Sequence, residues 1–197
     1  MHKLIVIGAI LAAASGTAFG ADNSLFKPGN DRIGGYMGPM IRFSPINGEA
    51  STLFGMRGGV IFNSIFSIGA GGYGLWTDVK ADRPDTSNLM MGVGGIIFEG
   101  IFPSHQVLHG TVSLLVGAGH VGTGRGWAMG MGWGHGSDGD RVFVLEPGAD
   151  LEINITPFFR LCPGVSYRWL SGSVRSVPSD RDLSGVSGNL LFKFGFF

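Results

Sequence analysis

Eight segments in which apolar and polar side chains alternate constrain the fold of this 197-residue chain more than any other feature. Alternation with a period of two is typical of a half-buried β-strand. Helices are disfavoured, because the 36 glycines recur every second to fourth position in many stretches and each costs up to ~1 kcal/mol in a helix. The segments are 33–44, 51–62, 65–76, 89–102, 106–121, 141–155, 159–170 and 185–197. The sequence therefore predicts an all-β fold of eight antiparallel strands.

The connections between these segments alternate in length. The connections after the second, fourth and sixth segments are tight turns at 63–64, 103–105 and 156–158. The other connections are longer and carry most of the loop charge, and they lie at 45–50, 77–88, 122–140 and 171–184. Short turns on one side and long loops on the other are the pattern of an outer-membrane barrel. Pro39, Pro147 and Pro163 fall inside predicted strands. Because proline removes a ladder hydrogen bond, we expect either β-bulges there or strand boundaries that differ from those predicted.

The alternation also divides the residues of each segment between two faces. In the last segment Phe192, Phe194 and Phe196 share one face, and Lys193 lies on the other. A soluble sandwich alternates in the same way, but its apolar face points inward. Three features favour a membrane barrel over a soluble sandwich. They are an N-terminal export signal, the alternating connection lengths and the terminal aromatic strand LLFKFGFF. The fold predicted is an up-and-down transmembrane β-barrel with apolar residues outward and polar residues inward.

The export signal is residues 1–20, MHKLIVIGAILAAASGTAFG. Lys3 supplies the positive charge, 4–14 form the apolar stretch, and Ala18 and Gly20 are the small residues before a cleavage site, as in secretory signal peptides. Eleven apolar residues are too few for the ~20 of a membrane-spanning helix. The predicted organisation is a signal peptide at 1–20, a short periplasmic segment at 21–32 and the outer-membrane barrel at 33–197.

An eight-stranded barrel is narrow enough to be filled by its own side chains. The charged residues predicted to face the lumen are Arg42, Arg57, Glu99, Glu146, Asp150, Glu152, Arg160, Arg168 and Lys193. These five cations and four anions nearly neutralise one another, and charges persist inside a membrane only when they pair or meet water. We expect a structural network of ion pairs. The alternative is a polar conduit, which needs more strands or a water-filled gap.

The third long connection contains the most unusual stretch of the chain. Trp127, Met129, Met131, Trp133 and His135 alternate with alanine and glycine, so an extended ribbon would carry all five on one face. The two flanking strands can simply extend beyond the membrane, with tryptophan at the interface. Alternatively, the ribbon is an exposed apolar surface for a hydrophobic ligand or a partner. The least favoured alternative is that the thioethers of Met129 and Met131 and the imidazole of His135 bind a soft metal ion.

Composition and short motifs argue against several other functions. The 14 Lys and Arg only balance the 14 Asp and Glu, which disfavours nucleic-acid binding. Two G-x-G-x-x-G matches, at 69–74 and 117–122, lack the following helix that dinucleotide binding requires. The aspartates at 138, 140, 180 and 182 lack EF-hand spacing. No cofactor and no metal are therefore expected.

One group of residues is compatible with an enzymatic function. His109, Thr111 and Ser113 share a strand face with Glu99 on the neighbouring strand, and a base, a hydroxyl and a carboxylate can form a nucleophilic site. The small-barrel lipid A deacylases use histidine and serine two residues apart, facing the lipid. The residue at that spacing is Thr111, and the group faces inward. We therefore expect no enzyme activity, and a lipid-modifying enzyme is the least favoured alternative.

The stretches GGYMGPMIRF, GAGGYGL, FVLEPGADLEINITPFFRLCPGVSYRW and LSGVSGNLLFKFGFF resemble small bacterial outer-membrane β-barrels of the OmpA/OmpX-like eight-stranded class. They are most similar to a group within it that has no established activity. The resemblance covers nearly all of 33–197 and implies the fold and a location in the cell outer membrane. It supplies no catalytic residues.

The function expected is a structural or surface-interaction role through extracellular loops, with the tight turns facing the periplasm. The first alternative is a narrow channel or transporter for small or hydrophobic solutes. The partners expected are outer-membrane lipids and lipopolysaccharide. A further partner is the barrel-assembly machinery, because a terminal aromatic strand resembles the signal that this machinery reads.

Overall fold

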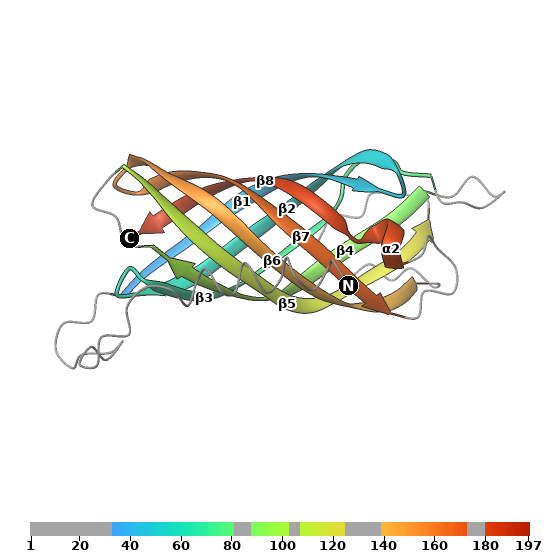
Figure 1. The fold of residues 1–197 in the computed structure, drawn as a ribbon, viewed down its shortest axis with the longest axis horizontal. Coiled ribbons are helices and arrows are strands. Elements are labelled where there is room, and N and C mark those ends of the chain that lie inside the picture. Colours follow the sequence, from blue (N-terminus) through green and yellow to red (C-terminus); the bar gives the residue numbers. More distant parts are fainter. Residues whose placement is uncertain (1–32, 81–87, 103–106, 125–138, 173–179) are drawn as a thin grey trace, which may run out of the picture.

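The computed structural model describes residues 33–80, 88–102, 107–124, 139–172 and 180–197, and it is a single closed barrel (Figure 1). Eight antiparallel strands follow one another around the wall in chain order, and β8 returns to pair with β1. The strands are β1 Ile33–Ile46, β2 Glu49–Phe62, β3 Phe66–Leu75, β4 Asn88–Ile101, β5 Leu108–Gly124, β6 Gly139–Thr156, β7 Phe159–Gly172 and β8 Gly185–Phe196. The predicted eight-stranded antiparallel up-and-down barrel is confirmed.

The barrel has two distinct ends. The turn end carries the connections β2–β3, β4–β5 and β6–β7 together with the last residue of β8, and the loop end carries the other four connections. The short helix α2, Asp180–Leu183, lies at the loop end beside β7 and β8 (Figure 1). No helix among the described residues is long and apolar enough to cross a membrane.

The first connection at the loop end is a tight turn and not the longer connection predicted over 45–50. Pairing between β1 and β2 continues to Ile46 and Glu49, which leaves only Asn47 and Gly48 between the strands. Both turn residues have positive φ, 51° and 76°. An Asn-Gly pair with two positive φ angles is the preferred two-residue hairpin, because its twist matches that of the strands.

The prolines inside the strands do not produce the expected bulges. Pro39, Pro147 and Pro163 keep continuous registers with β2, β5 and β8, respectively. A strand residue directs its N–H toward only one neighbouring strand, so a proline loses one bond on one side while the other side holds the register. The register shift in β6–β7 lies instead between Asn154 and Thr156, next to the turn.

The outer surface of the barrel is apolar, and many polar side chains point inward. Phe43 is 58% exposed, whereas its neighbour Arg42 is 3% exposed. Large apolar residues remain exposed on all eight strands. In a soluble protein this arrangement would leave an unusually extensive apolar surface. It is the distribution of a barrel surrounded by acyl chains.

The seam between β1 and β8 explains one of the glycines. A Cβ atom at Gly38 would lie 1.6 Å from the carbonyl oxygen of Phe192 on β8. No real Cβ tolerates that distance, so only glycine lets the two strand backbones approach closely enough to close the wall.

Candidate functional site

The barrel interior is the candidate functional site, and it has two halves. The half toward the turn end is filled by charged and hydrogen-bonding side chains. The half toward the loop end is filled mainly by an apolar group that we call the loop-half cluster. Its members are Ile46, Leu53, Leu75, Val79, Leu89, Met91, Val93, Val121, Val142, Val144, Leu170 and Leu183.

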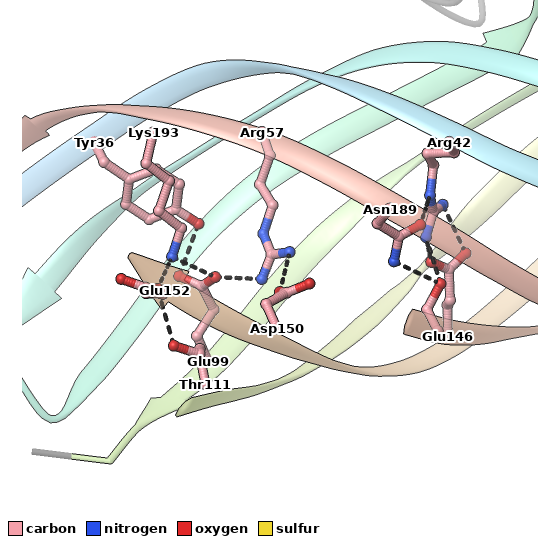
Figure 2. Close-up of polar contacts among 11 residues, drawn as sticks. Tyr36, Arg42, Arg57, Glu99, Thr111, Glu146, Asp150, Glu152, Asn189 and Lys193 are labelled. Carbon is pink, nitrogen blue, oxygen red and sulfur yellow. Dashed lines mark hydrogen bonds and ion pairs between the residues drawn. The ribbon is translucent and has the colours of Figure 1, made fainter. Parts of the chain in front are cut away.

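Glu99 on β4 lies in the first charged group, the turn-end network (Figure 2). Its carboxylate accepts a hydrogen bond from Tyr36 Oη at 2.7 Å, forms an ion pair with Arg57, and lies 3.3 Å from Lys193 Nζ. Arg57 also reaches Asp150 Oδ2 at 3.3 Å. Strands β1, β2, β4, β6 and β8 are thus joined through side chains that cross the interior.

Glu152 on β6 completes the turn-end network. It is fully buried, forms an ion pair with Lys193, and lies 3.0 Å from Arg160 Nη1. Its oxygens also contact Thr111 Oγ1 at 2.9 Å and His109 Nε2 at 3.1 Å. Lys193 bridges the two glutamates. These contacts offset the free-energy cost of removing the carboxylate charge from water.

A second group, the mid-barrel network, is centred on Arg42 and Glu146. Figure 2 shows it well separated from the turn-end network along the barrel. The Arg42 guanidinium binds both Glu146 oxygens, donates to Asn189 Oδ1 at 2.8 Å and to Ser166 Oγ at 2.7 Å. Tyr73 Oη donates to Glu146 at 2.6 Å, and the Arg42 guanidinium lies 4.2 Å above the Tyr73 ring. This fork-to-fork geometry is the strongest arrangement for an arginine–carboxylate pair.

Arg168 on β7 differs from the other charged residues of the interior. It is fully buried, yet none of the ion pairs among the described residues includes it. Its Nε donates to the Leu183 carbonyl oxygen at 2.9 Å, where α2 ends. Its Nη2 donates to Ser44 Oγ at 3.2 Å. Arg168 therefore attaches the β7–β8 connection to the barrel wall.

Backbone hydrogen bonds place described parts of two loop-end connections over the loop-half cluster. The Asn47 N–H donates to the Asp182 carbonyl at 3.0 Å, and the Leu89 N–H donates to the Val79 carbonyl at 2.8 Å. These bonds hold Val79 and Leu183 over the interior, where both are buried. The described parts of the β3–β4 and β7–β8 connections thus fold inward.

The histidine group proposed from the sequence contacts a different carboxylate from the one predicted. His109 and Thr111 both contact Glu152 and not Glu99, which faces Tyr36 and Arg57. The Thr111 hydroxyl donates directly to the carboxylate, whereas a nucleophile would donate to the histidine base. With Glu152 also bound to Lys193, this arrangement is that of a structural network.

The nine residues predicted to face the lumen therefore lie in three places. The turn-end network holds Arg57, Glu99, Asp150, Glu152, Arg160 and Lys193; the mid-barrel network holds Arg42 and Glu146; and Arg168 lies under α2. The five residues Trp127, Met129, Met131, Trp133 and His135 lie outside the described residues. Among those described, no group of three His, Cys, Asp or Glu side chains has the arrangement of a metal site.

Sequence reasoning missed the neutral partners of the two networks. Tyr36, Tyr73, Ser166 and Asn189 each bind a charged member. For Tyr36, Ser166 and Asn189 the available signal was an even spacing from a charged residue on the same strand, because such residues share one face. Strand β3 has no charged residue that could mark the inward position of Tyr73. It also missed the loop-half cluster, since an apolar interior breaks the simple rule of polar residues inside.

Comparisons with known proteins agree with this geometry. The sequence matches no protein-family model and no curated protein. The crystal structure of Neisserial surface protein A (NspA) is similar with a TM-score of 0.57 and 10% identity, over 85% of this chain and 98% of that one. Ail, the attachment invasion locus protein of Yersinia pestis, was solved with the heparin analogue sucrose octasulfate. It is similar with a TM-score of 0.50 and 14% identity, over 84% and 98%. The chain therefore has the fold of the small, OmpA/OmpX-like eight-stranded outer-membrane β-barrels.

Proposed function

We propose that this protein is an integral outer-membrane β-barrel with a structural or surface-interaction role. The wall and its filled interior form a rigid base, and the loop-end connections make the contacts outside the cell. The single observation that carries this proposal is the filling of the interior along its length. The turn-end network, the mid-barrel network and the loop-half cluster follow one another from one end to the other.

This filling argues against a channel. In a conducting barrel, charged lumen residues line water, and substitutions there tune selectivity. In this barrel the four buried carboxylates are all occupied by cations, and apolar side chains lie between them and the loop end. A solute would have to break several buried ion pairs and displace the loop-half cluster.

The apolar outer surface supports acyl chains of outer-membrane lipids and of lipopolysaccharide as partners. At the turn end, Phe66, Phe102, Phe158 and Phe196 are exposed on the outside, and at the loop end Trp76 and Trp169 are exposed. Tryptophans at one level and phenylalanines at the other resemble the aromatic girdles of outer-membrane barrels. The exposed terminal phenylalanines support recognition by the barrel-assembly machinery during insertion.

Two tests address this proposal directly. Mature protein in a planar lipid bilayer is expected to give no discrete conductance steps. Reproducible steps would overturn the scaffold role in favour of the narrow channel.

Orientation is tested with single cysteines, since native Cys162 is fully buried and provides an internal control. Asp78 is exposed at the loop end and Pro157 is exposed at the turn end. A membrane-impermeant maleimide applied to intact cells is expected to label D78C. P157C is expected to react only after the outer membrane is permeabilised. The reverse pattern would contradict the proposed orientation, and labelling of neither in the outer-membrane fraction would contradict the location.

A further inference from the structure

Among the described residues, one cation of the interior has no ion pair. Arg42, Arg57, Arg160 and Lys193 form ion pairs with Glu99, Glu146, Asp150 and Glu152. The fifth cation, Arg168, is 0% exposed and has no ion pair among the described residues. A buried charge is strongly unfavourable unless a counter-charge and hydrogen bonds compensate it.

Arg168 donates hydrogen bonds through two of its three guanidinium nitrogens. Its Nε and Nη2 bind the Leu183 carbonyl and the Ser44 hydroxyl, but Nη1 is buried with no acceptor among the described residues. The Ser44 hydroxyl donates its own hydrogen to the Val186 carbonyl at 3.1 Å and accepts from Arg168 Nη2. Nη1 of a guanidinium carries two N–H donors.

A second buried donor without a partner lies on the adjacent strand. Ser187 is fully buried, and its Oγ has no hydrogen-bond partner among the described residues. In the β7–β8 register Arg168 pairs with Gly185, and Ser187 is the next inward position along β8. Arg168 and Ser187 therefore present unused donors to the same part of the inner wall.

The inner wall opposite Arg168 is uncrowded among the described residues. Gly185 is the residue opposite Arg168, and a Cβ atom built there would meet nothing closer than the Pro45 carbonyl oxygen at 3.7 Å. Most other inward glycines of the barrel are crowded by neighbouring backbone, as at Gly38 and Gly195, where an added Cβ would lie 1.6 Å and 2.1 Å from a carbonyl oxygen. Among the described residues, the uncrowded position and the two unused donors thus lie at adjacent inward positions of the β7–β8 pair.

We propose that this position under α2 is a binding site for one small monovalent anion of the halide class, such as chloride. Arg168 Nη1 and Ser187 Oγ are its donors, and the space next to Gly185 holds it. One negative charge balances the nine lumen-facing charged residues, whose excess is a single positive charge. The anion would also complete the bonding of the side chain that holds α2 at its last carbonyl.

The direct test is anomalous diffraction from crystals of the mature barrel grown with bromide in place of chloride. We expect a bromide peak within hydrogen-bond distance of Arg168 Nη1. Density without anomalous signal at that place, or Nη1 bound to a carboxylate, would overturn the proposal.

The solution test compares the Tm of the protein in sodium chloride and in sodium gluconate at equal ionic strength. A one-site anion at about five times its dissociation constant is expected to raise the Tm by about 2–4 °C. The Arg168→Gln variant should lose this chloride dependence. The matched control, Arg160→Gln, removes a cation from the turn-end network and should keep it.

A second variant keeps the proposal testable if Arg168→Gln fails to fold. Gly185→Val leaves the Arg168 charge in place but fills the proposed space, so it should also abolish the chloride dependence and the bromide peak. A chloride effect that survives in Gly185→Val, or a wild-type Tm that is the same in both salts, would contradict the site.

Discussion

The two halves of the barrel interior hold the same wall together by opposite means. In the turn half, side chains from all parts of the wall meet through directional ion pairs and hydrogen bonds. In the loop half, they meet mainly through apolar packing, in the cluster that includes Leu53, Met91 and Leu170. An ion-pair network tolerates no missing member, because the remaining charges stay buried. An apolar cluster loses stability in proportion to the volume removed.

The largest effect is expected in the turn half. Glu152→Gln should destabilise the barrel by ~3–5 kcal/mol, because Lys193 and Arg160 lose their shared buried carboxylate. Urea unfolding of the purified barrel in detergent measures this change. The exposed Glu49→Gln removes the same charge and should stay within about 0.5 kcal/mol. Equal losses in both variants would show that net charge, and not the network, is responsible.

A somewhat smaller loss is expected in the loop half. Leu53→Ala should cost ~2–4 kcal/mol, because Leu53 is fully buried and its removal leaves a cavity. Val60 is 43% exposed on the outer face. Val60→Ala should cost about 1 kcal/mol or less, since lipid fills the gap. A Leu53→Ala loss no greater than that of Val60→Ala, in the same unfolding assay, would mean that the loop half contributes little to stability.

The mid-barrel network tests whether charge itself is needed at the boundary between the halves. Replacing Arg42 by Met and Glu146 by Leu together should be less destabilising than either single change, because no unpaired charge is left behind. The coupling energy from the double-mutant cycle is expected to be about 1–3 kcal/mol. Additive losses would show that the two residues act independently despite their contact.

The smallest effect concerns the turn that helps to close the loop half. Gly48→Ala is expected to cost about 1–2 kcal/mol, since its φ of 76° is unfavourable for a residue with a Cβ. Nothing lies within 4 Å of the added atom, so strain of the backbone is the only cause. Gly188→Ala also meets nothing within 4 Å, and Gly188 is not among the positive-φ glycines. That control should leave the unfolding midpoint unchanged.

The alternation in the sequence predicts the wall of the barrel well. It separates Arg42 from Phe43 and Lys193 from Phe194 because each charged residue stands next to an apolar one. It fails on β4, where Met91 and Ile96 are both apolar although one is buried and the other is exposed. When both faces of a strand are apolar, the sequence does not indicate which face points inward.

The partners of the charged residues could not be predicted, because they depend on strand stagger. Arg42 and Glu146 are 104 positions apart, and their contact requires the tilt and register of the whole barrel. The same applies to His109, whose carboxylate partner is Glu152 on β6 and not Glu99 on β4. Pairing across a closed sheet is set by shear, which no single segment encodes.

The position of Lys193 on the last strand has a consequence for the order of assembly. Synthesis delivers β8 after the other seven strands, and with it comes the one ammonium group that bridges Glu99 and Glu152. Until that strand docks against β1, Glu99 and Glu152 lack the cation that they share, and the sheet has two open edges. The ionic bridge between the two glutamates and the complete hydrogen-bonded ring therefore form together, in the step that closes the barrel.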